Sequence, residues 1–219
     1  MSPGVKPSSG SYEISEHRPP QSTQVMWDGI GIWRRYRHTG GVRVVSGTLG
    51  GRKVLVPEGE TTRPTSERVR EAIFNSLFSL DVIDGVGVLD LFAGSGALGI
   101  EALSRGAASA TFVETDRRAL GVLRQNITAL GLDGQSRVVA GDGVTALGRL
   151  GHHELVLLDP PYGFDDWAEL LAPLVDCVVV IESDREIPVP SEWEILRVKR
   201  YGTTVVTVAR ASQRGEETT

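Results

Sequence analysis

The sequence predicts an α/β fold in which a mostly parallel sheet carries helices on both faces. Two observations indicate this fold. From residue 85 onward, short apolar runs alternate with amphipathic segments of helical period, at a spacing typical of strand–helix–strand units. Four successive runs also end at or near a carboxylate: Asp90, Glu114, Asp142 and Asp159. Because ligands of open α/β sheets bind beyond the carboxyl ends of the strands, these side chains are expected at one functional edge.

The chain divides into four expected parts: 1–41, 42–84, 85–211 and 212–219. Residues 1–41 are rich in Ser, Pro and Gly and show no sustained period, so we expect a largely disordered extension. The segment 212–219 is polar and is expected to be loose.

The segment 42–84 predicts a hairpin and then a helix. Two strand-like runs, 42–47 and 52–56, flank a Gly-Gly turn. The helix is expected over 67–80, with Val69, Ile73 and Leu77 on its apolar face. We expect Arg68 and Arg70 to point away from that face.

The segment 85–211 predicts the sheet. Strands are expected near 86–90, 110–114, 136–140, 154–159 and 176–182, and helices at 97–105, 116–130, 143–150 and 165–173. Two further strand-like runs, 193–199 and 203–209, are separated by a short turn with a glycine. They predict a terminal antiparallel hairpin.

Composition indicates an ordinary globular chain. It has 219 residues, of which 40% are apolar and 23% charged. No apolar run approaches the ~20 residues that cross a bilayer, and the first thirty residues lack an apolar signal core. The single cysteine excludes an internal disulfide and a multi-cysteine zinc site. We therefore expect a cytoplasmic monomer with no membrane contact and no metal.

Charge is unevenly distributed along the chain. The net charge is −5, yet residues 34–71 hold nine basic residues against four acidic ones. Such asymmetry is typical of a face that contacts phosphates. The candidate phosphate contacts are Arg43, Arg52, Lys53, Arg63, Arg68 and Arg70. A solvated helix face with a charged tail remains the alternative.

A glycine-rich turn follows the first predicted strand, at Asp90-Leu91-Phe92-Ala93-Gly94-Ser95-Gly96. Glycines there let the backbone approach a ligand and open the next helix toward it. Glu114 ends the next strand, where a carboxylate can accept hydrogen bonds from both ribose hydroxyls. A nicotinamide dinucleotide is also compatible with this glycine pattern. However, Asp90 would bring negative charge near a pyrophosphate, so a cationic nucleoside, S-adenosylmethionine, fits better.

The sequence Asp159-Pro160-Pro161-Tyr162 follows the apolar run 155–158. The prolines restrict the backbone and remove two donors, so carbonyls and the Asp159 carboxylate can face outward as acceptors. Acceptors beside an aromatic ring suit a planar substrate with an NH2 group. A proline-rich strand-to-loop turn is the structural alternative.

Together these motifs resemble the class I S-adenosylmethionine-dependent methyltransferases, and within them the RsmD family. The resemblance runs from about Val42 to Ala209. It includes the leading hairpin, the Arg63-Pro64-Thr65 segment, the glycine-rich turn and Asp159-Pro160-Pro161-Tyr162. It implies a seven-stranded, Rossmann-like sheet whose terminal hairpin holds the reversed strand. It also implies methylation of a guanine exocyclic amine (N2) in small-subunit (16S) ribosomal RNA, in an assembled or assembling subunit.

The resemblance also implies roles for the residues. Asp159, Pro160, Pro161 and Tyr162 would hold the target base. The cofactor would contact Asp90, Phe92, Ala93, Gly94, Ser95, Gly96, Glu114 and Asp142. Three alternatives remain: a DNA amino-methyltransferase, a protein glutamine methyltransferase, and a non-enzymatic RNA-binding assembly factor.

Overall fold

The computed structural model describes residues 23–27, 33–37, 41–57 and 66–212, in two units that divide after Arg37. In the first unit, strands β1 (Thr23–Trp27) and β2 (Trp33–Arg37) pair antiparallel. This pairing differs from the disorder expected for 1–41. Both strands contain β-branched or aromatic residues that favour strands, but Ser, Pro and Gly dominate the composition around them. Apart from Gly41, the rest of the extension lies outside the described residues.

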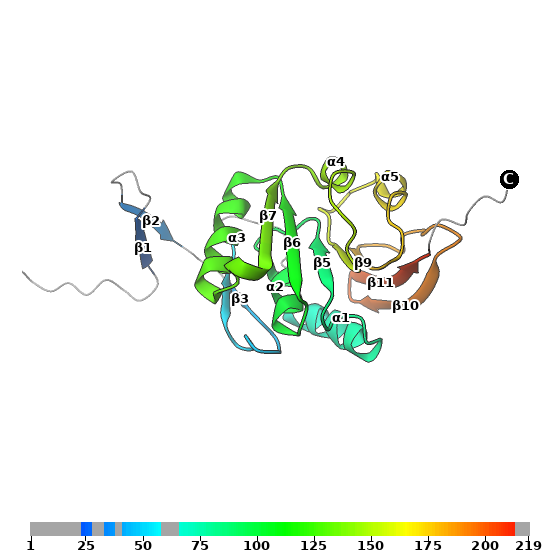
Figure 1. Ribbon diagram of the computed structural model, residues 1–219, viewed down its shortest axis with the longest axis horizontal. Helices are drawn as coiled ribbons and strands as arrows, with labels where there is room; N and C mark the ends of the chain where they lie inside the picture. Colours follow the sequence, from blue (N-terminus) through cyan, green and yellow to red (C-terminus); the bar gives the residue numbers. More distant parts are fainter. Residues whose placement is uncertain (1–22, 28–32, 38–40, 58–65, 213–219) are drawn as a thin grey trace, which may run out of the picture. The chain divides into compact units, whose positions relative to one another are not determined.

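A seven-stranded sheet forms the centre of the second unit, in the order β10-β11-β9-β8-β5-β6-β7. β9, β8, β5, β6 and β7 run parallel, and β11 is antiparallel to both its neighbours (Figure 1). The strands are β5 (Gly87–Asp90), β6 (Ser109–Glu114), β7 (Ser136–Ala140), β8 (Leu155–Leu158), β9 (Cys177–Ser183), β10 (Glu194–Tyr201) and β11 (Thr204–Ala211). The predicted sheet and its reversed strand are confirmed.

Helices cover both faces of this sheet. They are α1 (Glu67–Ser79), α2 (Ala97–Ser104), α3 (Arg117–Leu130), α4 (Gly143–Leu147) and α5 (Trp167–Leu171), with a 3-10 turn at Asp133–Gln135. Residues of α1, α2 and α3 share one apolar core, and those of α4 and α5 pack in the other. The last two helices are shorter than expected. Within the described ranges, no helix is long and apolar enough to span a membrane.

The two central strands explain where the sheet presents polar groups. Val88 of β5 and Leu157 of β8 enter the core under α1–α3, whereas Leu89 and Leu158 enter the core under α5. Both strands are therefore apolar on both faces, as buried parallel strands are. The strand after β5 in sequence, β6, lies on one side of this pair, and the strand after β8, β9, lies on the other side. A crevice is therefore expected at the carboxyl ends of β5 and β8.

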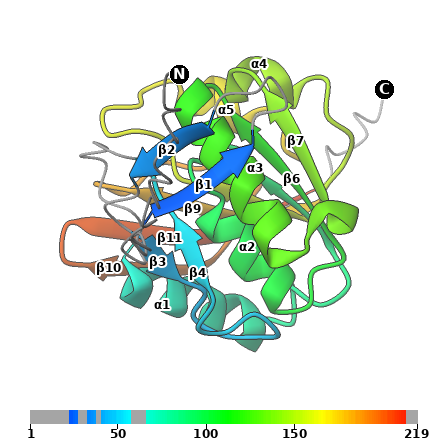
Figure 2. The ribbon, with the colours of Figure 1, turned by 90° about the vertical axis from the view of Figure 1, so that its left-hand side faces the viewer.

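The predicted N-terminal hairpin, β3 (Gly41–Arg43) with β4 (Lys53–Leu55), docks on α2 (Figure 2). In the turn between the strands, the Thr48 N–H donates to the Ser104 carbonyl at 2.8 Å and the Leu49 N–H to Ser104 Oγ at 3.0 Å. Gly47 has φ of 85°, and a Cβ there would lie 1.8 Å from the Ser104 carbonyl oxygen. Only glycine permits so close an approach.

Candidate active site

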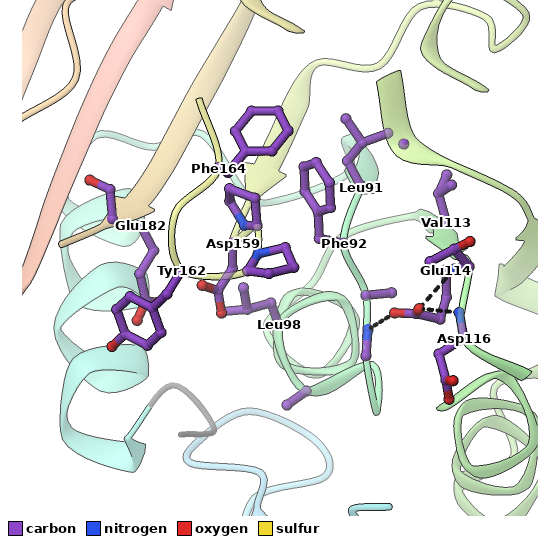
Figure 3. A pocket seen from close by; sticks show the side chains of 18 of the residues that line it. Leu91, Phe92, Leu98, Val113, Glu114, Asp116, Asp159, Tyr162, Phe164 and Glu182 are labelled. Carbon is purple, nitrogen blue, oxygen red and sulfur yellow. Dashed lines mark hydrogen bonds between the residues drawn. The ribbon is translucent and has the colours of Figure 1, made fainter. Parts of the chain in front are cut away.

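A pocket of about 500 Å³ opens at the carboxyl edge of the sheet, lined by residues that follow β5, β6, β7, β8 and β9 (Figure 3). Most of the predicted site residues meet in this one cavity. Those that line it are Phe92, Ala93, Gly94, Ser95, Glu114, Asp142, Asp159, Pro160, Pro161 and Tyr162. Asp90 and Gly96 do not line it and lie behind the turn.

The glycine-rich turn owes its shape to Gly96, which precedes the first residue of α2. Its φ is 85°, and a Cβ there would lie 2.5 Å from Leu123 Cδ1 of α3. A larger residue would therefore meet both backbone strain and a packed side chain. Gly94, also at positive φ, has open space beside it and lines the pocket.

Glu114 joins this turn to the end of β6. Its Oε2 accepts from the Gly94 N–H at 2.7 Å, and its Oε1 accepts from the N–H groups of Thr115 and Asp116, both at 2.7 Å. A carboxylate offers about four lone-pair directions, so capacity for a ligand hydroxyl remains. Asp142 lines the same end of the pocket and caps α4, because its Oδ1 accepts from the Thr145 N–H at 2.9 Å.

Asp90 is fully buried behind the turn. Its Oδ2 accepts from the Gly99 N–H of α2 at 2.9 Å, while Oδ1 has no hydrogen-bond partner among the described residues. The pKa of Asp90 is raised to about 7, chiefly by burial and additionally by the charges of Asp159 and Glu114, against the lowering effect of the Gly99 hydrogen bond. Asp90 therefore binds the first turn of α2 and does not line the cavity.

Asn126 of α3 connects the turn to the N-terminal hairpin. Its Nδ2 donates to the carbonyls of Ser95 and Leu55, and its Oδ1 accepts from the Leu55 N–H, all at 2.9 Å. The side chain is buried, so these bonds are shielded from water. The glycine-rich turn and β4 are thus held by one amide group.

The segment Asp159–Tyr162 forms the opposite part of the pocket. Asp159 and Pro160 are half-buried, whereas the Tyr162 side chain is 63% exposed. Behind them, the ring of Phe164 lies edge-on to Phe92 at 5.6 Å and to Trp167 at 5.1 Å between centroids. This aromatic row supports the loop from the side of α5.

Arg185, which follows β9, forms an ion pair with the loop that follows Tyr162. Its Nη2 lies 2.6 Å from Asp165 Oδ1 and 3.4 Å from the Phe164 carbonyl oxygen, and its Nη1 lies 3.1 Å from Asp184 Oδ1. Arg185 also lines the pocket. The loops after β8 and β9 therefore meet at the rim of the cavity.

The predicted phosphate contacts separate into three groups. Arg43, Arg52, Lys53 and Arg68 are exposed. Of these, Arg43 and Arg52 donate to the carbonyls of Gly51 and Ala129. Arg63 lies outside the described residues. Arg70 was expected to be exposed, and that prediction is wrong, because only 1% of its surface is accessible.

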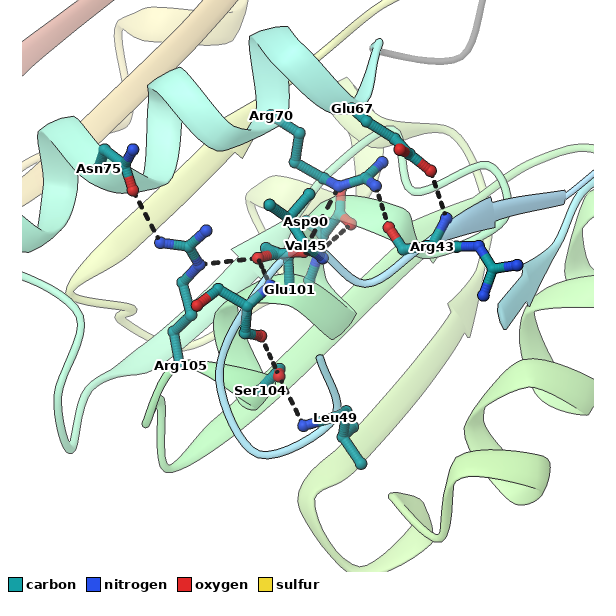
Figure 4. Close-up of polar contacts among 12 residues, drawn as sticks. Arg43, Val45, Leu49, Glu67, Arg70, Asn75, Asp90, Glu101, Ser104 and Arg105 are labelled. Atoms are coloured by element: carbon teal, nitrogen blue, oxygen red, sulfur yellow. Dashed lines mark hydrogen bonds and ion pairs between the residues drawn. The ribbon is translucent and has the colours of Figure 1, made fainter. Parts of the chain in front are cut away.

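Arg70 is held by a buried polar cluster of α1, α2 and the hairpin (Figure 4). Its Nη2 donates to the Arg43 carbonyl, and its Nε lies 3.5 Å from Glu101 Oε2. Glu101 also pairs with Arg105 at 2.7 Å and accepts from the N–H groups of Val45 and Ser46 at 2.7 and 3.1 Å. The helical period cannot predict this burial, because the partner is thirty-one residues away.

Several pocket residues were missed from the sequence: Phe164, Trp167, Glu182 and Arg185. Glu182 could have been found, because it is an acid near the end of a predicted strand, as Asp90, Glu114 and Asp159 are. Phe164 and Arg185 are placed by loop conformation, for which the sequence carries no periodic signal, and Trp167 is the first residue of α5.

Comparison with known proteins agrees with this geometry. A family model described as "Conserved hypothetical protein 95" matches residues 42–210. The chain is 38% identical to the "Ribosomal RNA small subunit methyltransferase D" of Escherichia coli K12, over 81% of this chain and 94% of that protein. For the Haemophilus influenzae protein of the same name, identity is 34%, over 74% and 90%.

Solved structures show the same likeness. The structure of the Escherichia coli protein yhhF superposes on this chain with a TM-score of 0.71 at 37% identity, covering 80% of this chain and all of the yhhF chain. A protein from Thermus thermophilus, TTHA0928, gives a TM-score of 0.65 at 28% identity, over 78% of this chain and 99% of that one. With the matched family model, the sheet order and the Asp159–Tyr162 loop, these likenesses show that the chain belongs to the RsmD family, with a Rossmann-like methyltransferase fold.

Proposed function

We propose that this protein transfers the methyl group of S-adenosylmethionine to the N2 amine of a guanine in small-subunit (16S) ribosomal RNA. The observation that carries the proposal is that Asp159 and Pro160 line the same cavity as Glu114 and the glycine-rich turn. A nucleoside and a planar amine can therefore meet in one site. Relatives named for methylation of ribosomal RNA support the choice of substrate.

At the nucleoside end, the remaining lone pair of Glu114 would accept from a ribose hydroxyl, and Asp142 from the adenine amine. Gly94 would let the methionine part approach the turn, beside Phe92, Ala93 and Ser95. Asp90 and Gly96 would act on the cofactor indirectly, because neither lines the pocket: Asp90 binds the first turn of α2, and Gly96 shapes the glycine-rich turn.

At the acceptor end, the difficulty lies with the nucleophile, because a guanine amine shares its lone pair with the ring. Asp159 and the Pro160 carbonyl would accept its two N–H groups and direct the lone pair toward the methyl carbon. The nitrogen forms the new N–C bond while the C–S bond breaks, and sulfur keeps that electron pair. The nitrogen then loses one proton, which the Asp159 carboxylate passes to water. Such preorganised acceptors stabilise the positive charge that develops on nitrogen.

The exposed ring of Tyr162 would stack on the target base, a contact worth roughly 1–3 kcal/mol in nucleic-acid systems. The base must be flipped out or already unpaired to enter the pocket. Pro161, which is exposed beside Tyr162, would restrict the loop to a shape that admits it.

The RNA would contact the exposed basic residues Arg43, Arg52, Lys53 and Arg68, with an assembled or assembling small subunit as substrate. Arg63 remains a prediction of the same kind, and Arg70 is withdrawn because it is buried. Action as a monomer in the cytoplasm, without a metal, also remains a prediction.

The test is transfer of tritium from labelled S-adenosylmethionine to ribosomal material from cells that lack the gene. Free small-subunit RNA, assembled small subunits, DNA and total protein are compared. We expect label in N2-methylguanosine from assembled subunits. Label only in DNA or protein would contradict the proposal and favour the other amino-group methyltransferases. Absence of label everywhere, despite measurable cofactor binding, would favour a non-enzymatic assembly factor.

A further inference from the structure

Glu182 stands next to Asp159 at the carboxyl edge of the sheet. In the parallel pairing of β8 with β9, Leu158 lies opposite Ile181, and Asp159 and Glu182 are the residues that follow. Residues at equal register on neighbouring strands point to the same face of a sheet. The alternation agrees, because Leu157 and Val180, two residues earlier in each strand, both enter the core under α1–α3.

Both carboxylates line the same pocket, and Glu182 is half-buried there. Figure 3 shows Glu182 on the Tyr162 side of Asp159, away from Glu114 and Asp116 at the cofactor end. A base stacked on Tyr162 with its amine at Asp159 would therefore present one of the two ring positions next to that amine toward Glu182.

The chemistry of that ring position differs among the bases. In guanine, the N2 amine lies between N1–H, which is a hydrogen-bond donor, and N3, which carries a lone pair; N1–H is the position that a carboxylate can accept from. In adenine and cytosine, the amine is next to a ring nitrogen that carries a lone pair. An ionised carboxylate can only accept hydrogen bonds, so it pairs with N1–H and is repelled by a ring lone pair.

We propose that Glu182 is the residue that selects guanine, by accepting the N1–H while Asp159 accepts from the N2 amine. This inference rests on the proposed function and assigns the choice of base to a particular side chain. Asp159 supports transfer to any exocyclic amine, whereas Glu182 distinguishes guanine from the other bases that carry one. A site built to receive a donor discriminates against an analogue that lacks it, because its own polar group is then left unpaired.

The experiment uses 2-aminopurine, which keeps the exocyclic amine of guanine but has a lone pair at N1. The methylated guanine is first located by nuclease digestion and mass spectrometry of the wild-type product. Small subunits are then reconstituted with guanine or 2-aminopurine at that position, and kcat/KM is measured for each. We expect the wild-type enzyme to prefer guanine by about 10- to 100-fold, from the strength of a hydrogen bond to a charged group.

The same pair of substrates is given to Glu182→Gln, whose amide can donate to a ring nitrogen or accept from N1–H. The preference for guanine should fall to within about threefold, since a neutral amide serves both bases. Because 2-aminopurine also lacks O6, the change in preference between wild type and Glu182→Gln is the quantity that isolates Glu182. Affinity for S-adenosylmethionine, measured by calorimetry, should be unchanged and reports on folding.

Glu186→Gln is the matched control, because it makes the same chemical change at an exposed residue outside the pocket. It should keep the wild-type preference. If Glu182→Gln also keeps that preference, or if the wild-type enzyme methylates both substrates equally, Glu182 does not select the base. If no N2-methylguanosine is formed at all, both the proposed function and this inference are wrong. Formation of N2-methylguanosine with an unchanged preference overturns this inference alone.

Discussion

Asp90 and Glu101 are both fully buried carboxylates, one beside α2 and one within it, yet their surroundings are opposite. Glu101, in the second half of the helix, is surrounded by two arginines and two backbone N–H groups. Asp90, beside the start of the helix, receives one N–H from Gly99 and faces the charges of Asp159 and Glu114. One end of α2 is therefore electrostatically compensated and the other is not.

The difference separates a carboxylate that holds structural elements together from carboxylates that can bind a ligand. A buried carboxylate with its charge matched can hold two parts of a protein together, as Glu101 holds the hairpin and α1 on α2. A group of carboxylates close to one another instead favours a ligand that brings donors or positive charge. The sulfonium and amines proposed for the pocket are such ligands. Four predictions test this separation.

The largest effect is expected from Arg70→Met, which removes one partner of the buried pair. The free energy of unfolding should fall by about 3–5 kcal/mol, because Glu101 loses a compensating charge. Denaturant titration measures the change. The affinity of the folded protein for S-adenosylmethionine should stay the same. Arg68→Met, at the exposed neighbour, is the control and should change stability by at most about 0.5 kcal/mol.

A loss of similar size in Arg68→Met would mean that the helix as a whole is sensitive and that the pair with Glu101 is not special. Replacing both partners, as Arg70→Met with Glu101→Gln, should recover part of the stability, since no fully buried charge of the pair then remains. The recovery is only partial because Arg105 loses its ion pair with Glu101.

Asp159→Ala should have the converse effect, with activity lost and the fold kept. We expect kcat to fall by about 10²- to 10³-fold, the range seen when one preorganised polar group is removed from an active site. Cofactor affinity should hardly change. Single-turnover methyl transfer measures the rate, and Asp159→Asn, which keeps an acceptor oxygen, should be less affected. Near-normal turnover in Asp159→Ala would refute the mechanism.

Asp90→Asn tests whether the uncompensated carboxylate costs stability. The pKa of Asp90 is raised to about 7 in the folded chain, so below about pH 4 both states hold the proton. As pH rises from about 4 through 7, the unfolded chain ionises first and the stabilising effect of the protonated group is lost. The asparagine cannot ionise, so its stability relative to wild type should rise by roughly 1–3 kcal/mol between pH 4 and 8. Denaturant titrations at both pH values measure this.

The matched control for Asp90→Asn is Asp166→Asn, at an exposed carboxylate. A pH dependence of Asp90→Asn no larger than that of Asp166→Asn would show that Asp90 does not titrate in the expected window.

The smallest effect is expected at the exposed basic residues. Lys53→Glu and Arg68→Glu are the clearest variants, because Arg43 and Arg52 also donate to backbone carbonyls. Each variant should weaken binding to small-subunit RNA and lower the slope of log affinity against log salt by about 0.7–0.9 per lost phosphate contact. Arg149→Glu, exposed after α4, should leave the slope unchanged. Equal slopes in all variants would remove the hairpin and α1 from the RNA-contacting surface.

Most of the sheet could be predicted from local patterns. Buried parallel strands are apolar throughout and their helices are periodic, so β5, β6, β7 and β8 begin and end within about two residues of the predicted positions. The pocket residues at the carboxyl ends followed from the same pattern, because parallel strands end at one edge. Asp90 was placed at the right edge, but its burial behind the turn depends on how α2 packs on β5.

By itself, the sequence determined the order of elements, the reversed strand and the acids at the rim, because each depends on residues near one another in the chain. Only the tertiary structure decided that Arg70 is buried against Glu101, that Asn126 joins the turn to the hairpin, and that Glu182 stands beside Asp159. Each of these pairs is distant in sequence. Such contacts arise from the packing of whole elements, and no local periodicity records them.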